Sequence, residues 1–100
     1  MSLYRIDIDR RAVKALRKTP PHVRARLTEA IDALADEPRP HGLKTLDASK
    51  KLYRLRVGGY RVVYQVRDRQ LVVLIVRVAD RKEVYRRLDD LVRRMPPPDQ

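Results

Sequence analysis

The chain has 100 residues, enough for one domain and with little room for a second. Lys and Arg number 24 against 13 Asp and Glu, so the net charge of +11 predicts a nucleic acid, an acidic protein or both as partners. The absence of cysteine excludes disulfide bonds and cysteine-ligated metals and favours the cytoplasm. The sequence shows no membrane-length apolar run, N-terminal signal segment or metal-ligand spacing, so we expect no membrane partner, metal or cofactor.

The first part of the chain is predicted to form a strand and a helical hairpin. Side chains alternate in character over residues 3–8, which is typical of a strand. Asp9 is expected to cap a short helix that ends near Arg17, and Pro21 to begin a second helix that extends to about Asp36. Each helix has one apolar stripe. The proline-rich and glycine-containing residues 37–42 are expected to form a loop.

The second part is predicted to form an antiparallel meander and a last helix. Residues 52–64 alternate on both sides of Gly58-Gly59, a two-residue turn in which both positions favour positive φ. Residues 71–78 predict a third, apolar strand, and residues 81–95 a helix. The predicted fold is therefore α+β: an N-terminal strand, a helical hairpin, a three-strand antiparallel meander and a C-terminal helix, with all helices on one face. Residues 1–95 are expected to form the single domain, and residues 96–100 a disordered proline-rich tail.

Three arginines are predicted to lie together on the sheet. The turn places Arg56 opposite Arg61 and Arg54 opposite Val63, and period-two alternation puts the three arginines on one face. By the same alternation the neighbouring tyrosines face the core. Like charges directly opposite each other are destabilising by roughly 0.2–1 kcal/mol. A sequence that retains this repulsion is expected to bind an anion there, and RNA is the first candidate.

Two blocks of the sequence resemble a known family. Residues 59–64 (GYRVVY) and 76–85 (VRVADRKEVY) resemble the RelE/ParE superfamily of bacterial toxins, most closely its RelE-like branch, and the likeness extends over about residues 4–88. RelE-like members are toxins of toxin–antitoxin pairs that cleave mRNA in the ribosomal A site. The resemblance thus implies a type II toxin that is a metal-independent endoribonuclease. Its implied partners are mRNA, the ribosome and a cognate acidic antitoxin in a hetero-oligomer.

The resemblance also implies a set of catalytic residues. The matching positions are Arg54, Arg56, Arg61, Arg81 and Tyr85. In the implied reaction a ribose 2′-hydroxyl attacks its own 3′-phosphate, which requires a base, an acid and cations. Arginine suits phosphate binding and is poorly suited to proton transfer. We therefore expect Tyr85 to be the general base, Arg61 and Arg81 to bind the phosphate, and the two strand arginines to hold the backbone and the leaving group. The expected RNA-binding residues are Lys50, Lys51, Arg54, Arg56 and Arg77.

Several alternatives remain open at this point. The pattern is also compatible with a solvated strand face that carries Arg54 and Arg56. Tyr85 could equally be a packed tyrosine at the boundary of the core, or could stack on mRNA bases. Ala79-Asp80 departs from the family pattern, and Asp80 would repel the phosphate or orient the next arginine. The strand positions also lack lysine. The alternative functions are a ParE-like inhibitor of DNA gyrase that cuts no RNA, and an inactive RNA- or antitoxin-binding module.

Overall fold

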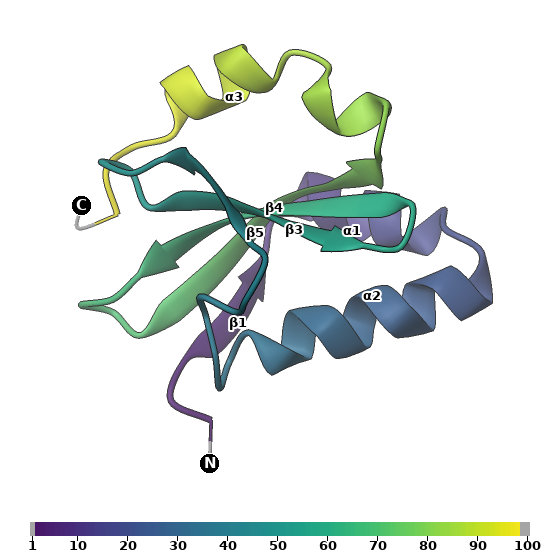
Figure 1. Cartoon of the computed structure of the whole chain (residues 1–100), viewed down its shortest axis with the longest axis horizontal. Coiled ribbons are helices and arrows are strands. Elements are labelled where there is room, and N and C mark those ends of the chain that lie inside the picture. Colours follow the sequence, from purple (N-terminus) through teal and green to yellow (C-terminus); the bar gives the residue numbers. More distant parts are fainter. Residues whose placement is uncertain (1, 99–100) are drawn as a thin grey trace.

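A five-stranded sheet forms the centre of the molecule (Figure 1). The computed structural model describes residues 2–98. The strand order is β1-β5-β4-β3-β2, with β1 parallel to β5 and all other neighbours antiparallel. The elements in chain order are β1 (Arg5–Ile8), α1 (Arg10–Arg17), α2 (Pro21–Ala33), β2 (Lys44–Asp47), β3 (Leu52–Val57), β4 (Tyr60–Arg67), β5 (Val72–Asp80), the 3-10 helix η1 (Glu83–Tyr85) and α3 (Leu88–Arg94).

The predicted α+β architecture is confirmed, with one strand that the sequence reasoning missed. β2 pairs with β3 at the edge of the sheet, so the antiparallel part has four strands and not three. This strand is only four residues long, its sequence KTLD contains one apolar residue, and a bulge interrupts it between Thr45 and Asp47. A short edge strand with so little alternation resembles a loop in sequence.

The predicted register of the β3–β4 hairpin is confirmed. Arg56 pairs with Arg61, and Arg54 pairs with Val63. The turn itself differs from the expectation, because only Gly58 of the two glycines has a positive φ, at 59°. A type II′ turn needs positive φ at its first central residue alone, and its twist matches that of the strands as well as a type I′ turn does.

This difference predicts unequal effects of alanine at the two glycines. Gly58→Ala is expected to destabilise the fold by about 1–2 kcal/mol, because a side chain in the left-handed region crowds the backbone. The added Cβ would meet the Arg26 guanidinium at 3.5 Å, an ordinary contact, so the cost comes from the backbone. Gly59→Ala is the matched control and is expected to change stability by less than about 0.5 kcal/mol. Urea unfolding of both variants measures the difference, and equal losses would contradict it.

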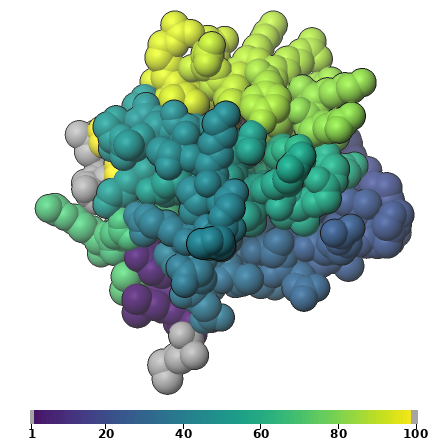
Figure 2. Space-filling model, viewed as in Figure 1, coloured from purple at the N-terminus to yellow at the C-terminus, as the bar shows by residue number. Residues whose placement is uncertain are grey.

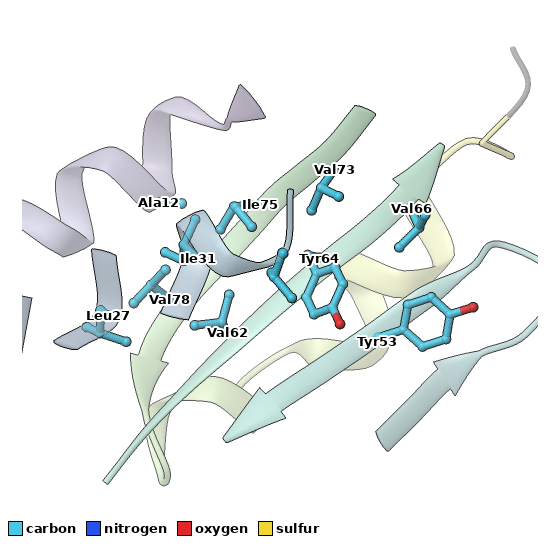
Figure 3. Close-up of a cluster of buried hydrophobic side chains, with 11 residues drawn as sticks. Ala12, Leu27, Ile31, Tyr53, Val62, Tyr64, Val66, Val73, Ile75 and Val78 are labelled. Carbon is cyan, nitrogen blue, oxygen red and sulfur yellow. The ribbon is translucent and has the colours of Figure 1, made fainter. Parts of the chain in front are cut away.

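The main core lies between the sheet and the helical hairpin (Figure 3). Asp9 caps α1 as expected, accepting a hydrogen bond from the Arg11 backbone N–H at 3.1 Å. Leu27 and Ile31 of α2 are almost fully buried against side chains of β4 and β5. α2 ends at Ala33, a few residues before its expected end. The α1–α2 hairpin therefore covers one face of the sheet, as predicted.

The C-terminal segment covers the opposite face, which corrects the prediction that all helices share one face. Val84 of η1 is fully buried against Val63 and Val76 of the sheet, and α3 packs beside them. In Figure 1, α3 lies across the sheet from α2. The segment is also not one helix over residues 81–95, because Arg87, with a φ of 54°, separates η1 from α3. Helical spacing predicted the apolar stripe of this segment, but it could not predict which face of the sheet the stripe covers.

Part of the segment expected to be a disordered tail contacts the sheet. The Gln65 side-chain amide donates to the Pro96 carbonyl at 2.9 Å, and Pro98 is buried. Residues 99–100 of that expected tail lie outside the described residues. Within residues 2–98, no helix has the length and apolar character needed to cross a membrane.

Asp68, in the β4–β5 turn, joins three distant parts of the chain. Its carboxylate accepts hydrogen bonds from Arg39 at 2.8 and 3.2 Å, from Lys51 at 2.7 Å and from the Tyr4 hydroxyl at 2.7 Å. The hydrogen bonds from Arg39 are the main reason why the pKa of Asp68 lies well below its usual range. The hydrogen bond that the Tyr4 hydroxyl donates to Asp68 is the main reason why the pKa of Tyr4 is raised.

Replacing Asp68 with asparagine is expected to lower the free energy of unfolding by about 1–2 kcal/mol at pH 7, after allowance for partial solvent screening. A carboxyl group with a depressed pKa in the folded state stabilises the fold above its unfolded pKa of about 3.9 and loses that contribution as the pH falls. The difference between Asp68→Asn and the native chain should therefore shrink below about pH 4. Because the folded-state pKa of Asp68 lies well below 3.9, the loss extends to lower pH, and denaturant unfolding at pH 7 and pH 2 tests this. A difference of the same size at both pH values would refute the ionic origin.

Candidate functional site

The structure brings two of the expected catalytic residues into direct contact. The Nη1 of Arg54 donates to the Tyr85 hydroxyl, and the guanidinium carbon of Arg54 lies 5.9 Å from the centroid of the Tyr85 ring. Arg54 is on β3 and Tyr85 ends η1, so the contact forms only because the C-terminal segment folds back across the sheet. Tyr85 remains 46% exposed, which leaves its ring accessible to a ligand.

Arg61 is more buried than its predicted position on an open face implied. Its side chain is 6% exposed, and its Nη1 donates to the carbonyls of Gly58 and Tyr60 at 3.2 and 3.0 Å. The guanidinium thus turns back toward the hairpin turn. Arg56, its cross-strand partner, is exposed. The like-charged pair is separated by this difference in direction, with one guanidinium against backbone carbonyls and the other in solvent.

Two buried guanidinium nitrogens at this site lack hydrogen-bond partners. Within residues 2–98, the Nε atoms of Arg54 and Arg61 are buried and unpaired. A buried donor without an acceptor costs roughly 1–3 kcal/mol, and more when it belongs to a charged group. The two arginines lie on neighbouring strands. Their guanidinium groups therefore retain donor capacity of the kind that phosphate oxygens satisfy.

Arg81 lies at the hairpin end of the site. Its backbone N–H donates to the Gly59 carbonyl at 2.9 Å, which fixes the start of the C-terminal segment beside the turn, and its side chain is exposed. Asp80, just before it, has a role that the sequence did not indicate. Its Oδ1 accepts from the backbone N–H groups of Lys82 and Glu83 at 2.9 and 2.8 Å. Asp80 therefore caps the short turn that leads to Tyr85.

Four of the five residues expected to bind RNA donate to other groups of the chain. Lys50 donates to the carbonyls of Val92 and Arg93, at the end of α3, at 2.7 and 3.1 Å. Lys51 forms the ion pair with Asp68. The remaining members of that set are Arg77, which donates to carbonyls of the C-terminal segment, and Arg54 and Arg56 of the hairpin. The structure thus places Lys50 and Lys51 in contacts apart from the Arg54–Tyr85 pair, whereas Arg77 contacts the backbone on both sides of Tyr85.

The sequence reasoning missed a basic residue beside the turn. The guanidinium of Arg26, on α2, lies 3.5 Å from the position that a Cβ of Gly58 would occupy. Lys44 of β2 is the cross-strand partner of Arg54 and is exposed. Neither residue belongs to a motif, and Arg26 looks like any charged residue on the solvent side of a helix. Their proximity to the hairpin arises only when the layers pack.

The chemistry available at this surface combines phosphate binding with one titratable hydroxyl. Guanidinium groups bind phosphate oxygens, and Tyr85 is the group suited to proton transfer. Across residues 2–98, no three His, Cys, Asp or Glu side chains gather closely enough to hold a metal ion.

Comparisons with known proteins agree with this fold. A family model described as the ParE toxin of the type II toxin–antitoxin system parDE matches residues 6–85. The mRNA interferase toxin RelE of Escherichia coli K12 is 37% identical over 86 residues, which cover 82% of this chain and 90% of that protein. Toxin RelG of Mycobacterium tuberculosis is 32% identical over 85 residues, covering 84% of this chain and 98% of RelG.

Solved structures show the same architecture. A variant of E. coli toxin RelE in the free state superimposes with a TM-score of 0.75 at 32% identity, covering 96% of this chain and 100% of that one. The toxin in the archaeal RelE–RelB complex of Pyrococcus horikoshii OT3 gives a TM-score of 0.73 at 34% identity, covering 79% and 96%. The shared sheet and helical hairpin define a small toxin domain. The chain belongs to the RelE/ParE superfamily of type II toxins, and the predicted resemblance to its RelE-like branch is confirmed.

Proposed function

We propose that this toxin cleaves mRNA in the A site of the translating ribosome. The observation that supports this most directly is the Arg54–Tyr85 contact, which places a tyrosine hydroxyl against a guanidinium with an unpaired donor. The relative with 37% identity is named an mRNA interferase, which supports the same activity. The proposed enzyme is an endoribonuclease that uses no metal ion.

The proposed reaction begins with loss of the proton from a ribose 2′-hydroxyl. Tyr85 accepts it, while the Arg54 guanidinium donates a hydrogen bond to the same oxygen. The 2′-oxygen then bonds to phosphorus, and the bond from phosphorus to the 5′-oxygen breaks. The 5′-oxygen takes up a proton from solvent water, which leaves a cyclic phosphate and a 5′-hydroxyl. Arg61 and Arg81 stabilise the added charge on the phosphate, and Arg56 lies toward the leaving group.

This set of groups is weak in acid–base catalysis, since arginine transfers protons poorly. We therefore expect slow cleavage of free RNA. On the ribosome, the substrate would be held with its 2′-oxygen in line with the leaving group, and such orientation contributes a large share of the rate. The RNA contacts predicted for Lys50, Lys51 and Arg77 stay a prediction, because these side chains donate to the chain itself.

The proposed protein partner is an acidic antitoxin in a hetero-oligomer, in the cytoplasm. Several similar solved structures are RelE–RelB toxin–antitoxin complexes. An open groove of about 870 Å³ runs between β5 and the C-terminal segment, with an apolar floor that includes Val76 and Leu91 and several arginines at its rim. Its apolar and basic lining suits an acidic amphipathic segment that folds on binding.

The gyrase alternative is supported by the family model, which is named for the ParE toxin. A gyrase inhibitor needs no proton acceptor at Tyr85, so the Arg54–Tyr85 contact favours the nuclease. The two activities also differ in what they damage. One produces new RNA ends, and the other affects DNA supercoiling.

The test is 5′-end mapping of one mRNA in two versions, with and without its start codon, before and after induction of the toxin. We expect new ends within codons only in the translated version. Growth arrest without new RNA ends, together with loss of gyrase supercoiling, would replace the proposal with the gyrase function. Absence of both effects would indicate a binding module without activity.

A further inference from the structure

Arg77 donates hydrogen bonds to the backbone on both sides of Tyr85. Its Nη1 donates to the Val84 carbonyl at 2.9 Å and to the Arg86 carbonyl at 2.7 Å. Arg54 binds the hydroxyl of the same tyrosine. Tyr85 is therefore held at its backbone by one arginine of β5 and at its hydroxyl by one arginine of β3.

The local backbone needs such support. η1 has three residues, and a helix this short leaves its last carbonyls without partners inside the helix. It cannot gain partners by continuing, because Arg87 takes a left-handed φ of 54°. The buried Val84 side chain anchors the residue before Tyr85. Arg77 supplies the hydrogen bonds that the carbonyls of Val84 and Arg86 lack.

A bulge in β5 aims Arg77 at these carbonyls. Val63 pairs with Arg77 and Tyr64 pairs with Ile75, so Val76 is an extra residue in β5. Ile75 belongs to the core under the helical hairpin, whereas Val76 packs in the cluster beneath the C-terminal segment. The bulge lets Arg77 lie on that same side. Burial is the main reason why the pKa of Arg77 falls below its ordinary value, followed by the charges of Arg11 and Arg94.

We propose that Arg77, which the sequence predicted to bind RNA, is instead a positioning residue that acts on RNA cleavage by fixing Tyr85. The proposal rests on the catalytic role of Tyr85 proposed above. A shift of about 1 Å in a reacting group can cost about a hundredfold in rate. Loss of the hydrogen bonds from Arg77 is therefore expected to lower kcat strongly and to change substrate binding little.

The test is a double-mutant cycle between Arg77→Met and Tyr85→Phe in ribosome-dependent cleavage. Arg77→Met is expected to lower kcat about 10–100-fold with little change in KM. In the Tyr85→Phe background the same change should cost less than about threefold, because its effect passes through the missing hydroxyl. Arg77→Lys, whose ammonium can still donate to a carbonyl, should restore most of the rate. Arg11→Met is the matched control, since Arg11 lines the same groove and influences Arg77 electrostatically.

A second measurement is independent of cleavage. In the toxin with ring-labelled tyrosines, the NMR resonance of Tyr85 is identified by its loss in Tyr85→Phe. It should move toward the free-tyrosine position in Arg77→Met and stay in place in Arg11→Met. An unmoved resonance in Arg77→Met, or equal losses of rate in both backgrounds with a raised KM, would overturn the positioning role. Normal cleavage by Tyr85→Phe alone would instead overturn the proposed role of Tyr85. The resonance would still test whether Arg77 positions this tyrosine.

Discussion

Tyr85→Phe is expected to lower ribosome-dependent mRNA cleavage by about 10²–10⁴-fold, the usual contribution of a positioned acid–base group. The substitution keeps the ring, so stacking on a base remains possible, and it removes only the hydroxyl that Arg54 contacts. Because Tyr85 is 46% exposed, we expect the free energy of unfolding to change by less than about 1 kcal/mol. Single-turnover cleavage on programmed ribosomes, with unfolding measured on the same preparations, gives both quantities.

The matched variants are Tyr85→Ala and Tyr60→Phe. If Tyr85 transfers a proton, Phe and Ala should be nearly equally inactive, and Tyr60→Phe, a change at the hairpin outside the proposed acid–base set, should be active. If the ring acts mainly by stacking, Phe should retain activity and Ala should lose it, which would contradict the general-base assignment. This comparison separates the two roles that the sequence left open for this tyrosine.

Tyr64→Ala is expected to destabilise the fold by about 3–5 kcal/mol, the usual cost of removing a buried aromatic ring. Tyr64 is fully buried, and its ring centroid lies 5.8 Å from that of Tyr53 (Figure 3). Small domains have a total stability of only about 5–15 kcal/mol, so a loss of this size is a large share. Thermal unfolding should therefore begin tens of degrees lower, at roughly 4–8 °C per kcal/mol.

Tyr64→Phe separates the hydroxyl from the ring. The Tyr64 hydroxyl donates to the Pro38 carbonyl at 2.8 Å and so fastens the α2–β2 loop to β4. Its loss should cost about 1–3 kcal/mol, because the carbonyl loses its donor in a buried setting. We expect a single cooperative transition for the native chain and both variants, as for one domain. Two separate transitions, or equal losses in the two variants, would contradict this account of the core.

The hairpin shows what local sequence can predict. Strict alternation and a diglycine turn defined both the pairing of Arg56 with Arg61 and the burial of Tyr64, since the register of a hairpin follows from its turn. The resemblance to RelE-like toxins depended on short blocks within the same part of the chain. The turn type was not predicted, because two adjacent glycines are compatible with more than one pattern of φ.

The candidate site was only partly predictable. Its members could be named from the sequence, but their directions could not. Arg61 turns back to the carbonyls of its own turn, and Asp80 accepts a hydrogen bond from the backbone N–H of Glu83, the first residue of η1. Both choices depend on which backbone groups lie within reach after folding. Arg26 was missed because nothing in the sequence of α2 distinguishes it from the other charged residues of that helix.

Different parts of the chain cover the two faces of the sheet, and the C-terminal segment covers one of them (Figure 2). In the space-filling view this segment, in yellow-green, lies on one side of the teal residues of the sheet, and the blue residues of α2 lie on the other side. Its apolar stripe packs on the face away from α1 and α2. An apolar stripe on a helix can pack on either face of a sheet. The C-terminal segment packs on the face that the helical hairpin leaves uncovered.

The sequence by itself determined most of the elements, the hairpin register, the basic character and the family, because turns, periodicity and charge act over a few neighbouring residues. Only the tertiary structure decided that Arg77 reaches the carbonyls on both sides of Tyr85 and that Tyr85 reaches Arg54. Strict alternation along β5 would put Arg77 on the face of Ile75, in the core beneath the helices. The bulge at Val76 reverses this, and it arises from pairing with β4, a contact between residues that are distant in the chain.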